Sequence, residues 1–324
     1  MQATCRRLLG LLSDGSFHSG EALGAALGIS RGAVWKQVAA LNALGLDVHR
    51  VRGRGYRLAR PLELLDRERL LAGLEPAARE RLDELFLFDS VDSTNTFLMQ
   101  QDRDAVVACI AEHQQAGRGR RGRDWISPFG ANLYFSLCWP FASLPPDFSA
   151  LGLAAGVAAR RALADIGCGG VQLKWPNDLY ANGAKLGGIL LEMRGEPPGP
   201  CRVIAGIGIN VVMPADAAND VDQPWIDLSR LAGTAPSRNA LAACLLNRWT
   251  EAFAAFEREG FAGFRAEWQD ADLLAGCEVE VADGKQRLYG RARGVAADGA
   301  LELETADGPR RVVAGDASLR RAAS

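Results

Sequence analysis

The spacing of hydrophobic residues changes twice along the chain, which predicts three regions. The first has apolar residues at helical intervals and then alternates apolar and polar residues over 48–58. The second mixes helical stretches at 150–166 and 239–259 with apolar runs typical of strands, at 85–88, 106–112, 132–139, 171–175, 186–193 and 203–210. The third has short alternating runs separated by Asp-Gly pairs, at 277–281, 287–291, 300–304 and 310–313. We expect an α+β multidomain protein divided into residues 1–62, 63–270 and 271–324.

The first region has the signals of a winged helix-turn-helix. Ser19, Gly28 and Ser30 suit the start of one helix, its end and the start of the next. Helical spacing leaves one face of the second helix outward, with Arg31, Trp35, Lys36 and Gln37. The alternating residues 48–58 predict a basic hairpin wing, with Arg52 and Arg54 at its turn. Such a module could enter a DNA major groove, and a helical pair used for protein contact is the alternative.

Charge favours the DNA interpretation. Residues 1–60 contain nine Lys and Arg against three Asp and Glu, a net charge of +6. Because the whole chain of 324 residues carries −2, the remaining part carries −8. A concentrated positive field attracts polyanions, above all nucleic acid.

Cysteine usage and hydropathy indicate the compartment. The seven cysteines are scattered without a Cys-x-x-Cys pair, which predicts reduced thiols and a cytoplasmic protein. No apolar run reaches the roughly 18 residues of a membrane span, so we expect no membrane association.

A glycine- and arginine-rich segment, residues 114–125, follows the strand expected at 106–112. It contains Gly-x-Gly-x-x-Gly, but no helical pattern follows, which argues against a dinucleotide-binding fingerprint. Glycines let backbone move and approach a ligand, and arginines neutralise phosphate, so the segment could close over a phosphorylated intermediate. A solvated basic loop is the equally open alternative.

Lysine is scarce in this chain, with four lysines among 37 basic residues. Two of them, Lys174 and Lys185, accompany Asp178 around an Asn-Gly turn that predicts a hairpin. Two ammonium groups and a carboxylate suit phosphoryl or adenylyl chemistry, because cations stabilise developing negative charge. A structural salt bridge is the competing interpretation.

Together these stretches closely resemble the bifunctional biotin protein ligase and biotin operon repressor family of bacteria. The motifs that carry the resemblance lie at residues 17–21, 92–95, 114–125, 127–134, 174–178, 185–190 and 206–210. The resemblance implies a winged helix-turn-helix, a central ligase domain related to class II aminoacyl-tRNA synthetases with a mixed, mainly antiparallel sheet, and a C-terminal SH3-like β-barrel.

The family activity has a chemical reason. A carboxylate does not acylate an amine directly because its oxygen is a poor leaving group. ATP with Mg²⁺ first converts biotin to biotinyl-5′-adenylate, and a lysine of a biotin carboxyl carrier domain of acetyl-CoA carboxylase then displaces AMP. The resemblance also implies that the adenylate acts as corepressor and promotes a homodimer that binds operator DNA.

The resemblance assigns site residues. Those expected at biotin are Ser93, Thr94, Asn95, Gln114, Arg118, Gly119, Arg120, Lys185 and Gly188. Those expected at ATP or the adenylate are Arg118, Arg120, Arg121, Trp125, Lys174, Asn177, Lys185, Asn210 and Trp225. The catalytic candidates are Lys185, Arg118, Lys174 and Asp178, and Asp178 is also the candidate Mg²⁺ ligand. Helix capping by Ser93 or Thr94 and a plain core position for Trp225 are the alternatives.

Some features depart from the family pattern or leave rivals open. Residues 213–224 should cover the adenine, yet they contain no basic residue and three acids, Asp216, Asp220 and Asp222, which puts retention of the adenylate in doubt. Gly32 weakens the second helix by roughly 1 kcal/mol. One rival function is a biotin-sensing DNA-binding regulator with little turnover, and the other is a lipoate ligase on the same scaffold.

Overall fold

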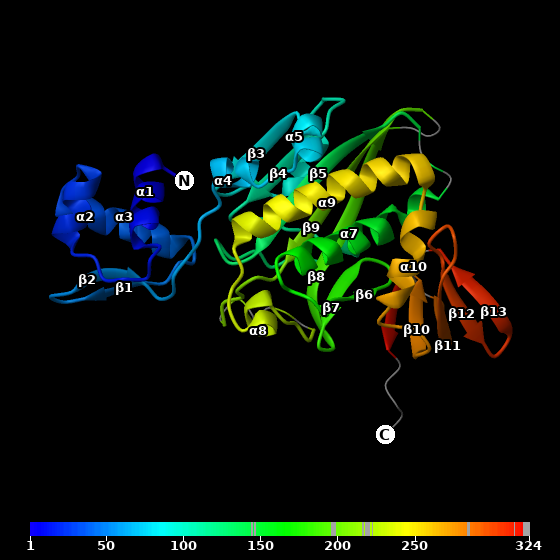
Figure 1. The fold of residues 1–324 in the computed structure, drawn as a ribbon. Helices are drawn as coiled ribbons and strands as arrows, with labels where there is room; N and C mark the ends of the chain where they lie inside the picture. Colours follow the sequence, from blue (N-terminus) through cyan, green and yellow to red (C-terminus); the bar gives the residue numbers. More distant parts are fainter. Residues whose placement is uncertain are drawn as a thin grey trace, which may run out of the picture.

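A computed structural model describes residues 1–143, 145, 147–195, 199–215, 217, 221, 223–283, 286–313 and 315–319. Three parts follow one another along the chain (Figure 1): an N-terminal module set apart from the rest, a large central domain, and a C-terminal sheet beside it. Within the described residues, no helix has the length and apolar character needed to cross a membrane.

The N-terminal module has the predicted helix-turn-helix and hairpin. Its elements are α1 (Ala3–Leu12), α2 (Gly20–Leu27), α3 (Arg31–Ala43), β1 (Val48–Val51) and β2 (Gly55–Leu58). Ser19 and Ser30 cap α2 and α3 by accepting from backbone N–H groups three residues on, and Gly28 ends α2 with φ 67°. Leu8, Leu23 and other apolar side chains form a core cluster of the module itself.

A seven-stranded mixed sheet forms the centre of the molecule. Its order is β3 (Glu84–Phe88), β4 (Val107–Ala111), β5 (Leu133–Phe141), β9 (Cys201–Ile209), β8 (Ala184–Gly195), β7 (Asp178–Ala181) and β6 (Gln172–Lys174). Neighbouring strands are antiparallel, as expected, except that β3 and β4 are parallel. The sheet is therefore mixed and mainly antiparallel, as expected; β3 and β4 run parallel because α6 (Thr94–Gln100) connects them, and a helical crossover returns the chain in the same direction.

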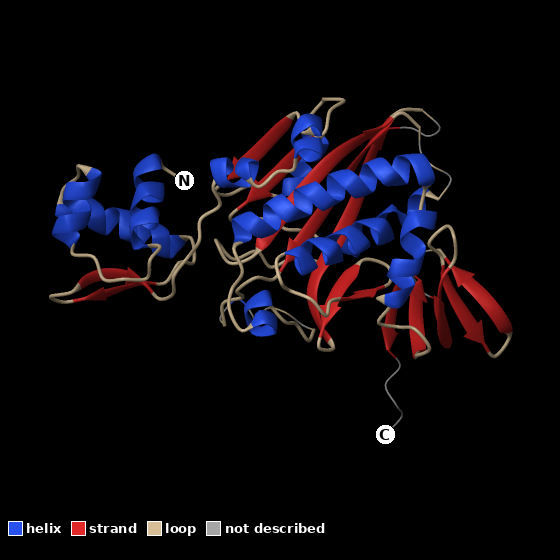
Figure 2. Cartoon of the chain, viewed as in Figure 1, coloured by secondary structure: helices blue, strands red, loops and turns tan. Residues whose placement is uncertain are grey.

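Two long helices, α7 (Leu151–Asp165) and α9 (Arg238–Glu259), lie across one face of this sheet (Figure 2). Ring stacking of Trp249 on Phe253, with Phe135 and Trp139 edge-on, fills the space between α9 and the strands. α6 packs on β4, β5, β9 and β8 instead. The remaining helices are α4 (Arg67–Ala72), α5 (Pro76–Arg81), α8 (Leu228–Ala232) and α10 (Ala262–Asp270), with the 3-10 turns η1 (Arg120–Gly122) and η2 (Phe148–Ala150).

The C-terminal part is a five-stranded antiparallel sheet. Its order is β13 (Gly308–Val312), β12 (Leu301–Thr305), β11 (Gln286–Val295), β10 (Glu278–Asp283) and β14 (Asp316–Leu319). The alternating runs therefore do form strands joined by hairpins. Among the described residues, the edge strands β13 and β14 do not pair to close a barrel.

Candidate active site

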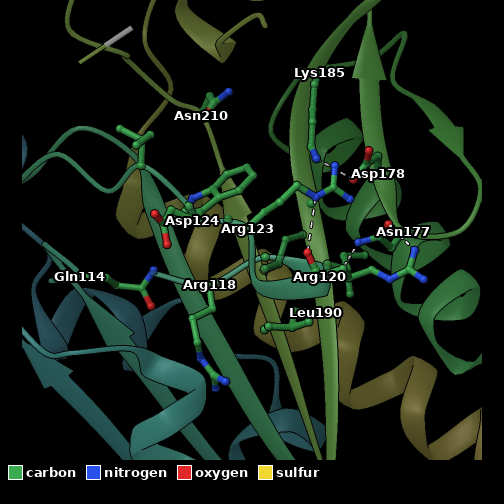
Figure 3. A pocket seen from close by; sticks show the side chains of 18 of the residues that line it. Gln114, Arg118, Arg120, Arg123, Asp124, Asn177, Asp178, Lys185, Leu190 and Asn210 are labelled. Atoms are coloured by element: carbon green, nitrogen blue, oxygen red, sulfur yellow. Dashed lines mark hydrogen bonds and ion pairs between the residues drawn. The ribbon is translucent and has the colours of Figure 1, made fainter. Parts of the chain in front are cut away.

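A pocket of about 460 Å³ lies between α6, strands β8 and β9, and the glycine- and arginine-rich segment. The residues predicted from the sequence that line it are Ser93, Thr94, Asn95, Gln114, Arg118, Gly119, Arg120, Trp125, Asn177, Asp178, Lys185, Gly188, Asn210 and Trp225. They come from segments more than 100 residues apart in the chain and meet here (Figure 3). Such a concave site with converging polar groups is typical of small-molecule binding.

Glycines on the two central strands make room for the pocket. Gly188 on β8 and Gly208 on β9 are cross-strand partners. A Cβ at Gly208 would come within 2.2 Å of the Trp125 indole, and one at Gly206 within 2.1 Å of Asn95 Oδ1. Any larger residue on this face would therefore displace the side chains that line the pocket.

The start of α6 supplies one polar wall. Gln114 Oε1 accepts from the Thr94 N–H at 2.9 Å and from the Thr94 hydroxyl at 3.1 Å. Ser136 donates to Asn95 Oδ1 at 2.6 Å, and all these side chains but Gln114 are buried. Ser93 also accepts from the Thr96 N–H at 3.4 Å, so it caps α6, as the alternative interpretation had it.

The hairpin of β7 and β8 supplies a partly buried ion pair. Lys185 Nζ lies 2.8 Å from Asp178 Oδ1, and the two side chains point toward each other (Figure 3). Their exposed fractions are 13% and 17%. Backbone bonds tie Lys185 to residues 224 and 226, which holds Trp225 alongside β8. The scarce lysine is thus fixed at the pocket by the strand, its partner acid and a neighbouring segment.

The glycine- and arginine-rich segment is folded back against the protein rather than extended into solvent. Its N–H and carbonyl groups pair across a turn, with Gly119 N donating to Arg123 O at 2.6 Å. Arg118 pairs with Glu192 at 2.8 Å. Arg120 and Arg123 lie 3.3 and 3.0 Å from the Asp316 carboxylate in the C-terminal sheet. Burial lowers the pKa of Arg120, and Asp316 opposes that effect.

Two predicted residues lie outside the pocket lining. The Lys174 ammonium lies 5.1 Å from the Tyr180 ring centre and donates to the Tyr180 hydroxyl at 3.4 Å. Burial lowers the pKa of Lys174, whereas Asp178 raises it. Arg121 adopts φ 56° and turns to Asp316 and to the carbonyl of Ala282.

The sequence did not reveal several residues of the site, among them Glu192, Asp124 and Asp316. Asp316 had no signal, because it lies almost 200 residues beyond the arginines it contacts. Gly206 and Gly208 did carry a signal in the sequence, because two glycines two positions apart in a strand leave room on one face of the sheet. The acids Asp216, Asp220 and Asp222 lie outside the described residues. Among the described residues, no three His, Cys, Asp or Glu side chains gather to hold a metal ion.

The N-terminal module exposes a second candidate surface. Trp35 is 53% exposed on α3, beside exposed Arg31 and Lys36 and partly buried Gln37. Arg52 and Arg54 are exposed at the hairpin turn, where Arg54 stacks over the Phe17 ring at 4.1 Å. Helix face and hairpin together present the predicted basic surface.

Comparison with known proteins decides the family. The chain is 39% identical to the bifunctional ligase/repressor BirA of Escherichia coli over 98% of this chain and 97% of that protein. The chain belongs to the bifunctional ligase/repressor family. This chain is 31% identical to BirA of Bacillus subtilis, over 98% of this chain and the whole length of that protein.

The family's parts match each region. The HTH domain family matches residues 6–57, the biotin/lipoate A/B protein ligase family 87–210, and the biotin protein ligase C-terminal domain 276–320. A solved structure of the biotin protein ligase from Aquifex aeolicus in complex with biotin and ATP aligns with a TM-score of 0.63 and 29% identity. It covers 74% of this chain and all of that one.

Proposed function

We propose that this protein is an ATP-dependent biotin protein ligase that also acts as a biotin-responsive repressor of biotin synthesis genes. The observation that carries the proposal is the single pocket in which the Lys185–Asp178 pair faces the Thr94–Gln114 polar wall. It occurs in a chain similar to bifunctional ligase/repressors over nearly its whole length.

The pocket divides into two ends with different chemistry. Ser93, Thr94, Asn95 and Gln114 form the end for the ureido ring of biotin, with Gly188 in the floor. The other end has Trp125, Asn177, Asn210 and Trp225 for the nucleotide. Trp125 Nε1 and Asn210 Oδ1 are buried without a hydrogen-bond partner among the described residues, which supports a polar ligand at this end.

Adenylation needs cations where charge accumulates. The biotin carboxylate oxygen attacks the α-phosphorus of ATP, the bond to the bridging oxygen breaks, and pyrophosphate leaves. Lys185 lines the pocket, where its ammonium can stabilise the pentavalent transition state. Arg118, Gly119 and Arg120 then cover the anhydride, and Arg121 and Lys174 support this arrangement from outside the pocket.

Mg²⁺ fits this site as a companion of the ATP phosphates. Magnesium commonly binds through one or two carboxylates together with substrate phosphates and water. Asp178 offers one such carboxylate, and the described residues provide no all-protein cage. When bound, the ion neutralises phosphate charge.

Transfer to the acceptor lysine needs a base. The lysine amine of a biotin carboxyl carrier domain attacks the acyl carbon, its proton must leave, and AMP departs. Asp178 faces the pocket and can receive that proton, with Lys185 balancing its charge.

The remaining assignments complete the proposal. The N-terminal residues 1–62 bind operator DNA through Arg31, Trp35, Lys36, Gln37, Arg52 and Arg54. The adenylate-bound form is a homodimer, residues 63–270 form the ligase domain, and 271–324 have the SH3-like topology. Seven free cysteines favour the reducing cytoplasm.

The test is adenylate formation followed by transfer to a purified carrier domain, measured by pyrophosphate release and mass spectrometry. The wild type should label the carrier with biotin and not with lipoate. Lys185→Ala should lose at least about 100-fold in adenylate formation, the scale of losing one transition-state donor. The exposed Arg79→Ala is the matched control. If the carrier stays unlabelled while operator binding is intact, the protein is a biotin-sensing regulator and not a ligase.

A further inference from the structure

A carboxylate that is not part of the pocket lining borders the biotin end of the pocket. Side chains alternate along a strand, so Gly188, Leu190 and Glu192 of β8 share one face. Gly188 and Leu190 line the pocket, and Glu192 is the next member of that row, with a 22% exposed side chain. Its position places an acid beside α6 and the glycine- and arginine-rich segment at once.

One oxygen of Glu192 accepts from two pocket residues. Its Oε2 lies 2.9 Å from Asn95 Nδ2 and 2.8 Å from Arg118 Nη2. Asn95 comes from α6 and Arg118 from the glycine- and arginine-rich segment between β4 and β5, so the acid joins two walls of different origin.

The contact fixes the Asn95 amide. Its Oδ1 accepts from Ser136 at 2.6 Å, and its Nδ2 donates to Glu192 and, at 3.3 Å, to the Leu190 carbonyl. An amide can turn over by exchanging oxygen and nitrogen, and these partners allow one orientation only. The lack of a Cβ at Gly206 leaves the space in which the amide lies.

Of the four arginines of the glycine- and arginine-rich segment, Glu192 pairs with Arg118. Arg120, Arg121 and Arg123 gather at Asp316 in the C-terminal sheet, whereas Arg118 turns to Glu192 at the other end of the segment. Figure 3 shows Arg118 and Arg120 directed away from each other. The segment is therefore held at two points by acids from different domains.

We infer that Glu192 is a positioning residue of the ligase, which orients Asn95 toward biotin and holds Arg118 at the pocket. Glu192 itself is not among the residues that line the pocket. Its two tasks need different properties: Asn95 needs an acceptor atom, and Arg118 needs a negative charge. The inference rests on the proposed function.

Two variants separate these tasks. Glu192→Gln keeps an acceptor for Asn95 and removes the charge, while Glu192→Ala removes both. We expect Glu192→Ala to raise the biotin KM more than tenfold and Glu192→Gln to leave it within threefold. Both should lower kcat for pyrophosphate release at least fivefold, because both release Arg118.

Adding either Glu192 variant to Arg118→Ala should cost no further kcat, since the charge of Glu192 acts through Arg118. The matched control is Glu304→Ala, which removes a strand glutamate paired with Arg293 far from the pocket and should leave both constants unchanged. Thermal midpoints are measured for every variant, and Glu192→Gln carries the test if Glu192→Ala does not fold.

Three results overturn the inference: unchanged constants in Glu192→Ala, equal biotin KM values for the Gln and Ala variants, or additive losses with Arg118→Ala. The wild type runs in the same assay. A wild type without pyrophosphate release refutes the proposed function, whereas an active wild type with an indifferent Glu192→Ala refutes this inference alone.

Discussion

The two ends of the chain are attached to the central domain in different ways. The N-terminal module buries its apolar residues in a cluster of its own, which Phe129 of the central domain joins. Among its described residues the C-terminal sheet has no separate cluster: Val279, Val281, Leu301 and Leu303 belong to the core of the central domain. A module with its own core can move as a unit, and a sheet that shares a core cannot.

The polar contacts follow the same division. The N-terminal module reaches the central domain through the Arg6–Asp89 ion pair and through Arg60, which donates to the Val212 carbonyl at 2.8 Å. The C-terminal sheet is joined by a backbone bridge between residues 173 and 272 and supplies Asp316 to the pocket arginines. The comparison indicates that the N-terminal module is a separate unit suited to regulation, whereas the C-terminal sheet forms one unit with the domain that contains the pocket.

Deletion is the strongest way to break this comparison. Removing residues 271–324 should abolish cooperative unfolding and ligation, because it uncovers core residues worth about 1.5–3 kcal/mol each, against a domain stability of about 5–15 kcal/mol. Removing residues 1–62 should leave a folded ligase without operator binding. Calorimetry and a mobility shift measure both, and a cooperatively folded, active 271–324 deletion would contradict the shared core.

Asp316→Ala tests whether the C-terminal sheet belongs to the catalytic unit. It removes the carboxylate shared by three arginines of the glycine- and arginine-rich segment, so we expect about a tenfold loss in adenylate formation, of the order of one charge-assisted contact at about 1.5–3 kcal/mol. The thermal midpoint should change little. Asp298→Ala, which removes an acid paired with Arg311 in the same sheet, is the control. Equal activity of the two variants would show that the C-terminal sheet has no part in catalysis.

The pH dependence of stability at Asp272 tests the backbone bridge between residues 173 and 272. Burial raises the pKa of Asp272 to about 6, although the Leu274 N–H opposes the shift. The folded state thus binds this proton more tightly than the unfolded state, so the group costs stability above pH 6 and the cost disappears as pH falls toward 4.

Asp272→Asn should therefore raise the free energy of unfolding by about 1–3 kcal/mol at pH 7.5 and by little at pH 4.5. Denaturant unfolding at the two pH values measures it. The exposed turn variant Asp307→Asn is the control. An Asp272→Asn gain that is equal at both pH values would show that the charge is not responsible.

Arg60→Ala has the smallest expected effect, and it tests the contact between the N-terminal module and the central domain. It removes one hydrogen bond to Val212, worth about 1 kcal/mol, next to pocket residue Met213. We expect ligation to stay unchanged, while the gain in operator affinity on adding biotin and ATP falls severalfold. Arg79→Ala is the control, and an unaltered gain would mean that this contact does not couple pocket and module.

Much of the fold followed from local patterns. The caps at Ser19 and Ser30, the Asn182-Gly183 turn and the Asp-Gly turns of the C-terminal sheet act over a few residues, so the sequence contains all the information they need. The direction of β3 against β4 did not follow, since it depends on a crossover that packs against the sheet.

The site was predictable where the motif residues themselves make the contacts. The pairing of Lys185 with Asp178 was open between chemistry and a salt bridge, and the structure shows an ion pair inside the pocket. Lys174 is the cross-strand partner of Asp178 and shares its face of the hairpin, but its ammonium lies over the Tyr180 ring, outside the pocket lining.

By itself the sequence determined the three regions, the basic N-terminal module and the residue types gathered for adenylation, because spacing, charge and turn chemistry are local properties. Only the tertiary structure decided that Glu192 and Asp316 hold opposite ends of the arginine segment, and that one terminal region has its own core. Contacts between residues about 75 to 200 positions apart depend on how strands and helices pack, and no local pattern records that packing.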